Sequence, residues 1–251
     1  MKALVRWMLL VLVAALSVQL YFVGRIALMA LLDPQSTAFQ RSEIYRLVAE
    51  KGSLKWRQQW VPYSELSDNL KRAVIVSEDA TFIEHEGVDL EALEKAWEKN
   101  TQAEQRAEKA ASRLGSKAAP AGKAAARPPK IVGGSTITQQ LAKNLFLSGE
   151  RTLLRKGQEL ALTLMLEALL SKQRILEIYL NNVEWGEGVF GAEAAAQHYY
   201  RKPASKLSAY EAARLAVMLP RPKYFETRPG SGYLASRAST IAARMGGVIV
   251  P

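Results

Sequence analysis

Hydrophobic residues are distributed unevenly, and the longest apolar run lies at the amino terminus. Residues 8–24 carry no charged side chain, and after Arg25 the apolar run continues to Leu32. A helix of about 20 apolar residues spans the hydrocarbon core of a bilayer. The run therefore predicts one membrane crossing. Lys2 and Arg6 precede it, and positive charges favour the cytoplasmic side, so we expect the rest of the chain to be exported.

A cleavable signal peptide is the alternative interpretation of this run. Residues 15–17 (Ala-Leu-Ser) offer small side chains at the spacing of a cleavage site. The apolar stretch continues well past them, however, which favours an uncleaved anchor. We therefore predict a cytoplasmic terminus and transmembrane anchor over residues 1–33 and an exported domain over 34–251.

Beyond the anchor, apolar residues recur with helical spacing. A helix begins near Ser67 and continues to Val76, and Asp89 is placed to cap the next one. Further helices are predicted over 137–147, 155–170, 171–181, 192–200, 209–219 and 233–245. No set of alternating strands is evident, so the fold class should be mainly α. Leucines cover most of the circumference of 155–170, which predicts a helix buried through the centre of the domain.

Residues from about 100 to 130 interrupt this pattern. They are rich in Ala, Lys and Arg, include three prolines, and contain almost no large apolar side chains. Such a segment buries too little surface to offset the entropy of ordering. We expect a mobile basic insertion whose first part, 104–113, prolongs a solvated helix. Its charge suits anionic lipid headgroups, but a solubilising loop without function explains it equally well.

Composition excludes several kinds of chemistry. The 251 residues contain no cysteine, which rules out disulfides, thiolate metal ligands and a cysteine nucleophile. The two histidines, His85 and His198, are too far apart for a helical zinc motif. A formal net charge of +10 favours polyanionic partners: nucleic acid, an anionic membrane or a phosphorylated substrate. Export makes nucleic acid the least suitable of the three.

The first candidate chemical segment is an acidic stretch over residues 77–87. Glu78 directly follows the apolar residues RAVIVS, so it should emerge at the end of a packed helix. Burial there would raise the pKa of its carboxyl group and fix its position. The other acids have plainer interpretations on residue type alone: Asp79 caps a turn, while Glu84 and Glu86 are solvated.

Two further segments lie after the insertion. Residues 133–144 combine two glycines with Ser and Thr before a helix, whose free amides would attract an anion such as phosphate. A simple helix cap is the alternative, and the spacing excludes a Walker loop. Farther on, Arg155, Lys156 and Glu159 are spaced to meet on one helix, either as a site or as an ordinary exposed ion pair.

Five motifs occur in a recognisable order: EDATFIEH followed by Gly87, GGSTITQQLAKN, RKGQE with the later ILEIYLN, GVFGAEAAAQHYY, and LAVMLPRPKYF. They resemble the five motifs of the family 51 glycosyltransferases, which polymerise the glycan strands of peptidoglycan, and they extend from Glu78 to Phe225. The chain resembles the monofunctional biosynthetic members most. Bifunctional penicillin-binding relatives append a transpeptidase domain, but no serine here begins an SxxK motif, so no transpeptidase activity is expected.

The resemblance implies a fold and a reaction. The family fold is mainly α and lysozyme-like, with a head lobe and a partly membrane-embedded jaw lobe. The family transfers the growing chain from undecaprenyl diphosphate to the 4-hydroxyl of lipid II. The product has a β-1,4 linkage and the anomeric configuration inverts.

The resemblance also assigns roles by motif position. Glu78 matches the catalytic base, and Glu159 matches the second essential carboxylate. Lys143, Arg155 and Lys156 match the positions that contact the diphosphate. The remaining positions that match substrate-binding residues are Asp79, Phe82, His85, Gly134, Ser135, Thr138, Gln139, Gln140 and Asn144. Metal ligands are unknown. Some family members use a divalent cation, magnesium or manganese, which the sequence does not require.

The implied setting is a single pass through the bacterial inner membrane with a periplasmic glycosyltransferase domain. The implied partners are lipid II, the growing glycan chain, the membrane, and proteins of cell division or elongation. Nucleic acid is not among them. Two alternatives remain: a lysozyme-like lytic glycosidase, which would share the fold and the paired acids, and a non-enzymatic membrane-anchored scaffold that binds the cell wall.

Overall fold

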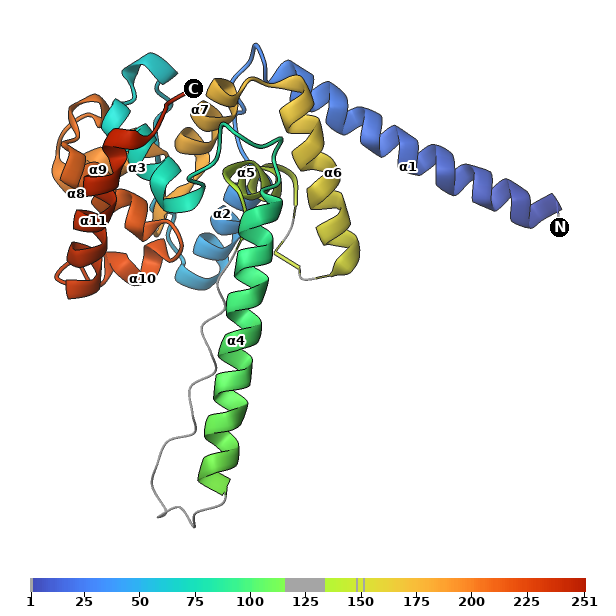
Figure 1. The fold of residues 1–251 in the computed structure, drawn as a ribbon. Helices are drawn as coiled ribbons and strands as arrows, with labels where there is room; N and C mark the ends of the chain where they lie inside the picture. Colours follow the sequence, from blue (N-terminus) through green and yellow to red (C-terminus); the bar gives the residue numbers. More distant parts are fainter. Residues whose placement is uncertain (1, 116–133, 148, 151) are drawn as a thin grey trace. The chain divides into compact units, whose positions relative to one another are not determined.

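The computed structural model describes residues 2–115, 134–147, 149–150 and 152–251, and most of them are helical (Figure 1). The described chain forms two compact units, one comprising residues 1–87 and 136–251 and the other residues 88–135. About half of the predicted mobile insertion, from residue 116 on, lies outside the described residues, and the part before it is helical. The mainly α fold class is confirmed, while the division into head and jaw lobes stays a prediction.

The amino-terminal helix α1 (Lys2–Leu28) is long and apolar enough to cross a membrane. Its residues 2–18 are exposed, whereas Ile26 and Met29 just beyond it are buried in the core of the larger unit. The helix is thus free of protein contact over its first part and docked at its end. Both features fit the predicted anchor.

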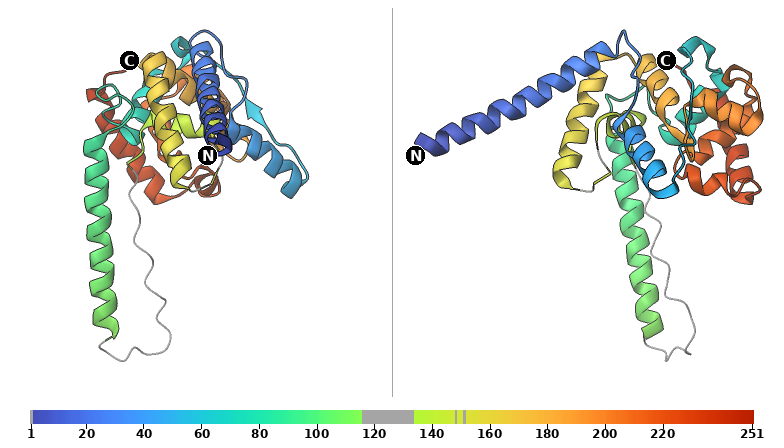
Figure 2. Two further views of the ribbon diagram at one scale, coloured as in Figure 1. Left: turned by 90° about the vertical axis from the view of Figure 1, so that its right-hand side faces the viewer. Right: turned by 180° about the vertical axis from the view of Figure 1, so that it is seen from behind.

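Polar caps define the start of most helices in the larger unit, as the sequence predicts. The capped helices are α3 (Asp68–Glu78), α5 (Ile137–Phe146), α6 (Leu153–Leu169), α7 (Lys172–Asn182) and α9 (Ala209–Met218). In each, a Ser or Thr side-chain oxygen accepts a hydrogen bond from the third helical amide. The predicted helices α8 (Ala192–Tyr200) and α11 (Gly232–Arg244) are also present, and α3, α9 and α11 pack together (Figure 2).

The helix α2 (Ala38–Lys51) and several short elements were not predicted. The short elements are α10 (Pro222–Glu226), the 3₁₀ turns η1 (Tyr63–Glu65), η2 (Ala204–Lys206) and η3 (Met245–Gly247), and the strands β1 (Arg57–Gln58), β2 (Glu184–Gly186) and β3 (Val189–Phe190). The strands form one sheet in the order β1-β3-β2, with β1 parallel and β2 antiparallel to β3. Strands of two or three residues are too short to show an alternating pattern.

The central buried helix is α7, not α6. Ile175, Leu176 and Ile178 on α7 are fully buried. On α6, Leu162 is fully buried but Leu164 is 50% exposed, so the prediction that α6 runs through the core is wrong. Protein covers only one face of α6, and the leucines of the other face remain exposed.

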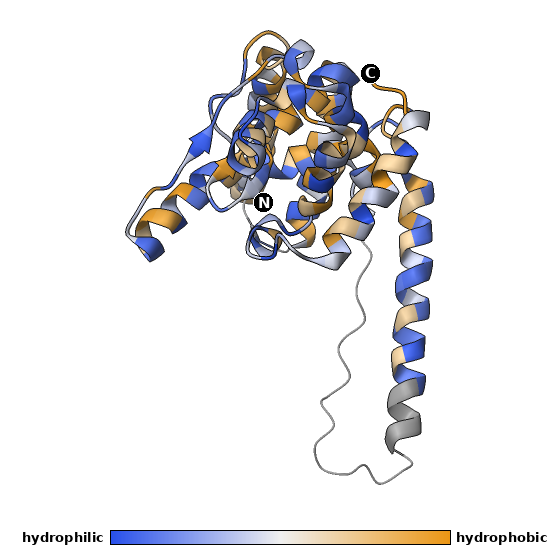
Figure 3. Ribbon diagram, turned by 90° about the vertical axis from the view of Figure 1, so that its left-hand side faces the viewer, coloured by the Kyte–Doolittle hydropathy of each residue, from blue (hydrophilic) through white to orange (hydrophobic). Residues whose placement is uncertain are grey.

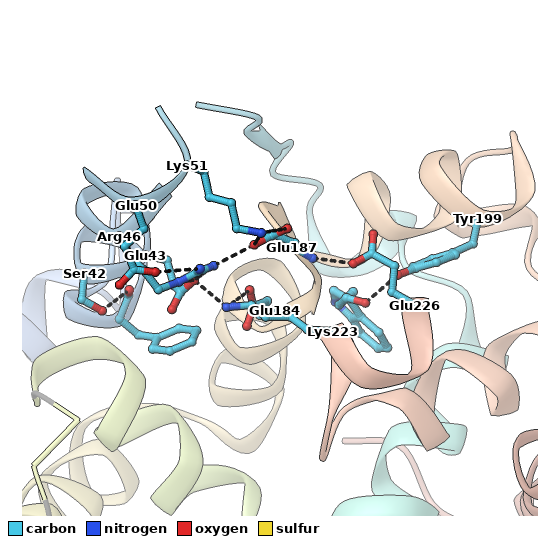
Figure 4. A network of polar contacts seen from close by, with 12 residues as sticks. Ser42, Glu43, Arg46, Glu50, Lys51, Glu184, Glu187, Tyr199, Lys223 and Glu226 are labelled. Atoms are coloured by element: carbon cyan, nitrogen blue, oxygen red, sulfur yellow. Dashed lines mark hydrogen bonds and ion pairs between the residues drawn. The ribbon is translucent and has the colours of Figure 1, made fainter. Parts of the chain in front are cut away.

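A charged network joins three elements that are distant in sequence (Figure 4). Glu43 of α2 pairs with Arg46 at 2.9 Å and with Lys223 of α10 at 2.5 Å. Lys223 also lies 3.1 Å from Glu184 of β2, and Arg46 lies 3.1 Å from Glu187 in the turn that follows. The network therefore ties α2 and α10 to the small sheet.

The smaller unit contains the long helix α4 (Leu90–Gly115), along which hydrophilic and hydrophobic residues alternate (Figure 3). The Ala92 amide donates to Asp89 Oδ1 at 2.7 Å, which confirms the predicted cap. The helix includes 104–113, so the predicted helical extension is also confirmed.

Candidate active site

Glu78 ends α3 in a partly buried position, as its place after an apolar run predicts. Gln140 of α5 donates through Nε2 to Glu78 Oε2 at 2.9 Å, and Ser77 Oγ lies 3.5 Å from Oε1. Burial raises the pKa of Glu78, while hydrogen bonds from Gln140 and Ser77 oppose it. The nearby charge of Asp79 raises the pKa and that of Lys143 lowers it. The expected raised pKa is therefore present, with burial as its main cause.

The side chain of Gln140 is itself held in place. Tyr179 of α7 donates from its hydroxyl to Gln140 Oε1 at 3.0 Å. Tyr179 is buried, and burial raises the pKa of its hydroxyl, so it stays a donor. These two hydrogen bonds fix the orientation of the Gln140 amide, so that its nitrogen faces the Glu78 carboxylate and its oxygen faces Tyr179. Gln140 and Tyr179 both lie in the sequence motifs, but they are 39 positions apart and their contact was not predicted.

Asp79 connects the loop after α3 to the start of α5. Its Oδ2 accepts from the Ile137 amide at 2.9 Å, and its Oδ1 lies 2.8 Å from His85 Nε2. The Gly87 amide donates to His85 Nδ1 at 3.1 Å, so the ring proton lies on Nε2 and is donated to Asp79. Asp79 and His85, both predicted substrate-binding residues, are thus engaged with each other inside the protein.

Two more predicted substrate-binding residues support the same loop. Phe82 is fully buried, and the Lys172 ammonium lies 4.6 Å from its ring centroid. Thr138 donates to Glu167 at 2.6 Å, and Lys172 binds both Glu167 at 2.9 Å and the backbone oxygen of His85 at 2.5 Å. These residues fix the loop that follows Glu78 against α5, α6 and α7.

The start of α5 carries a full capping box. The hydroxyl of Thr136 accepts from the Gln139 amide at 3.2 Å, and the Gln139 side chain accepts from the Thr136 amide at 3.1 Å. Thr136 Oγ1 also donates to Gly87 O at 2.6 Å. The Ile137 amide at this helix start is taken by the internal carboxylate of Asp79. Binding of a phosphate by this segment stays a prediction.

Gly134 and Ser135 belong to the smaller unit. A Cβ atom on Gly134 would lie 3.3 Å from the Cα of Leu93, so the position allows a close approach of two backbone segments. Ser135 is exposed.

The first turns of α6 carry a cation cluster. Arg155 Nη1 lies 2.9 Å from Glu159 Oε2, and Lys156 pairs with Glu159 Oε1. Glu159 is only 4% exposed. The predicted convergence of these three residues is confirmed, and the interpretation as an exposed ion pair is excluded because Glu159 is buried. Arg155 Nε is buried without a hydrogen-bond partner among the described residues.

Lys143 of α5 interacts electrostatically with Glu78 and with the cation cluster of α6. Lys143 is exposed, but the surrounding protein displaces water from its ammonium group and so lowers its pKa, and the charges of Arg155 and Lys156 lower the pKa further. The carboxylates of Glu159 and Glu78 act in the opposite direction. Glu78, Lys143 and the α6 cluster therefore share one electrostatic neighbourhood. Asn144, the next residue of α5, is partly buried.

A divalent cation stays a prediction, and in the described part of this neighbourhood the carboxylates of Asp79 and Glu159 are engaged by the protein itself. Both oxygens of Asp79 and both oxygens of Glu159 are already occupied by internal partners. Magnesium and manganese require several free oxygen ligands around one point. We therefore derive no chemical step through a metal ion.

A family model described as Transglycosylase matches residues 46–117 and 116–246. The chain belongs to this transglycosylase family. It is 53% identical over 238 residues to a biosynthetic peptidoglycan transglycosylase of Burkholderia thailandensis, covering 95% of this chain and 84% of the relative. The protein of the same description from Paraburkholderia phytofirmans is 49% identical over 251 residues, covering 98% and 95% of the two chains. This transglycosylase is thus an enzyme of the family that the five motifs predict.

Proposed function

We propose that this transglycosylase polymerises peptidoglycan glycan strands from lipid II, with Glu78 as the general base. The observation that carries the proposal is the partly buried Glu78 carboxylate, fixed by Gln140 and interacting electrostatically with Lys143. Family membership and the names of the relatives support the reaction class.

In the proposed step, the 4-hydroxyl oxygen of lipid II forms a bond to the anomeric carbon of the growing chain. The bond from that carbon to the diphosphate oxygen breaks, and undecaprenyl diphosphate leaves with the electron pair. The hydroxyl proton passes to Glu78. A carboxylate with a raised pKa is a stronger base than an ordinary one, which suits this role.

The cations of α5 and α6 act on the leaving group. Negative charge develops on the diphosphate as the bond breaks, and preorganised cations stabilise it. Lys143, Arg155 and Lys156 supply them, while Glu159 holds the last two in place. The Nε of Arg155 is buried and has no hydrogen-bond partner among the described residues, so it is a candidate donor to a phosphate oxygen if the side chain moves on binding. A lytic glycosidase, whose leaving group carries no diphosphate, has no use for such a cluster.

Inversion of configuration follows from the assigned roles. Glu78 removes a proton from the acceptor and Glu159 is neutralised by two cations, so neither serves as a covalent nucleophile. The acceptor hydroxyl then attacks the face opposite the leaving diphosphate, which converts an α-linked donor into a β-linked product.

The membrane setting suits a prenyl-linked substrate. We propose that α1 anchors the protein in the bacterial inner membrane, with the catalytic domain on the periplasmic side. Lys2 and Arg6 precede the apolar run and favour this orientation. The exposed leucines of α6, including Leu153 at 93% and Leu154 at 85%, would then lie against lipid.

The test is polymerisation of labelled lipid II by full-length protein with the substitution Glu78→Gln. Glutamine keeps the size of the side chain and the contact with Gln140 but cannot take a proton. We expect the rate to fall about a hundredfold or more, with the fold unchanged by circular dichroism. Glu84→Gln, an exposed acid of the same loop, is the matched control and should retain the wild-type rate.

Two results would contradict the proposal. Near-normal turnover by the Glu78→Gln protein would exclude Glu78 as the base. Release of soluble fragments from purified sacculi, without conversion of lipid II into long glycan, would identify a lytic enzyme instead.

A further inference from the structure

A reciprocal pair of amide side chains joins the anchor to the helix of the cation cluster. Gln19 of α1 donates through Nε2 to Gln158 Oε1 at 3.0 Å, and Gln158 donates through Nε2 to Gln19 Oε1 at 3.2 Å. We call this pair the amide clasp. Each side chain supplies one donor and one acceptor to the other, so the clasp satisfies both amides mutually.

The clasp lies at the point where α1 stops being fully exposed. Residues 2–18 are exposed, whereas Gln19 is partly buried. The two helices approach at the end of α1 and diverge away from it (Figure 1), and the clasp bridges them on the diverging side. Farther along, Phe22 packs on Phe146 of α5 with ring centroids 5.3 Å apart, and Arg174 of α7 binds the Met29 oxygen at 2.7 Å. The anchor thus contacts three helices of the site region.

The clasp also falls at hydrocarbon depth. The apolar run begins at Met8, and about 20 residues cross the hydrocarbon core, which places its far edge near residue 27. Gln19 lies well inside that limit, and Gln158 must share its depth. The exposed leucines at the start of α6 agree with this placement. Because no water competes inside a bilayer, an unpaired amide there is costly and a paired one is retained.

Gln158 is the direct neighbour of Glu159 and lies within the turns that carry Arg155 and Lys156. Anything that moves Gln158 therefore moves the cation cluster. The anchor sets the depth of the protein in the bilayer. A fixed link between the anchor and α6 therefore sets where the cations of α6 lie relative to the anchor.

We propose that Gln19 and Gln158 are positioning residues for catalysis, which hold the start of α6 against the anchor so that its cations meet the diphosphate. This inference rests on the proposed function. It predicts that the transmembrane helix contributes to turnover itself, beyond keeping the enzyme at the membrane.

The experiment compares Gln19→Leu, Gln158→Leu and the double variant as full-length proteins in nanodiscs, with lipid II as substrate. Leucine keeps α1 apolar and keeps α6 helical. Each single variant leaves one amide unpaired, so we expect kcat to fall about three- to tenfold. KM should change little, because misplaced cations weaken stabilisation of the charge that develops during the reaction.

The double variant distinguishes a clasp from two independent side chains. If the amides act on each other, the second substitution removes nothing further, and the double variant should lose no more kcat than the worse single variant. Ser17→Ala is the matched control on the same helix. Ser17 is exposed, its hydroxyl bonds only to the backbone of its own helix at Val13, and its removal should leave kcat unchanged.

Three results would overturn the inference. One is wild-type kcat in both single variants. Another is a double loss equal to the product of the two single losses. A third is a lower thermal midpoint with unchanged kcat and KM, which would mark a purely structural contact. A wild-type protein that makes no glycan would instead refute the proposed function, and this inference with it.

Discussion

Asp79 illustrates how one carboxylate organises the loop beside the proposed base. It is buried, and each of its oxygens faces a fixed donor: the Ile137 amide on one side and the Nε2 proton of His85 on the other. His85 cannot reverse its tautomer, because its Nδ1 already accepts from the Gly87 amide. The loop therefore requires an acceptor at both oxygen positions of Asp79.

This geometry predicts that Asp79→Asn is destabilising despite its similar shape. Asparagine replaces one of the two carboxylate oxygens by an NH2 group. That NH2 would face the Ile137 amide or the Nε2 proton of His85, and a buried donor would be left unpaired. We expect the free energy of unfolding to fall by about 1–3 kcal/mol. Chemical denaturation of the detergent-solubilised protein measures it, with the exposed Glu86→Gln as control. An unchanged midpoint for Asp79→Asn would show that His85 or the loop rearranges freely.

Local spacing predicted part of the site at this scale, and long-range contacts account for the rest. The i, i+3 and i, i+4 spacing was enough to place Lys156 and Arg155 beside Glu159. The contact of Gln140 with Glu78 joins residues 62 positions apart, so no local pattern encodes it. Sequence motifs also cannot separate a residue that touches substrate from one, such as Asp79, that is held internally.

At the scale of elements, periodicity and capping residues predicted most long helices because each signal lies within the helix itself. The short strands and α10 lack enough residues for a period to appear. The burial of α6 was mispredicted for a physical reason: leucines on all faces indicate an apolar surrounding, which can be lipid as well as protein. Leu160 and Leu164, exposed at 46% and 50%, lie on that outer face.

The cap of α5 is the element with the clearest testable energetics. The Thr136 hydroxyl accepts from the Gln139 amide and donates to the Gly87 oxygen, so its removal leaves groups on both α5 and the loop unpaired. We expect Thr136→Ala to lower the free energy of unfolding by about 1–2 kcal/mol. Thr136→Ser keeps the hydroxyl and should stay close to wild type in the same denaturation experiment. Equal losses in the two variants would assign the effect to the methyl group and not to the cap.

At the scale of the whole molecule, one buried acid sets a pH dependence of stability. Burial raises the pKa of Glu184 to about 7, and the charge of Lys223 opposes this shift. Lys223 Nζ lies 3.1 Å from Glu184 Oε1, yet that oxygen has no well-aligned hydrogen bond among the described residues. The ion pair thus compensates burial only in part, at the junction where α2, α10 and the sheet meet (Figure 4).

The sign of the effect follows from linkage. In the unfolded chain Glu184 has an ordinary pKa of 4.5, so between that value and about 7 the folded protein binds the extra proton. Proton binding by Glu184 therefore stabilises the folded protein fully below pH 4.5, and this stabilisation is lost as the pH rises to about 7. Glu184→Gln removes the charge, so the variant should exceed wild type by up to about 3 kcal/mol at pH 8 and by only a small part of that near pH 5.

Glu187 provides the opposite control within the same network. Hydrogen bonds from Arg46 and Lys51 lower the pKa of Glu187, so its stabilisation is present above the ordinary pKa and lost only in acid. Glu187→Gln should therefore weaken the fold equally at pH 6 and pH 8, whereas the Glu184→Gln difference must grow across that interval. Unfolding midpoints at these two pH values and at pH 5 separate the cases. A Glu184→Gln difference that does not change with pH would mean that Glu184 is charged in the folded protein throughout, with Lys223 fully compensating its burial.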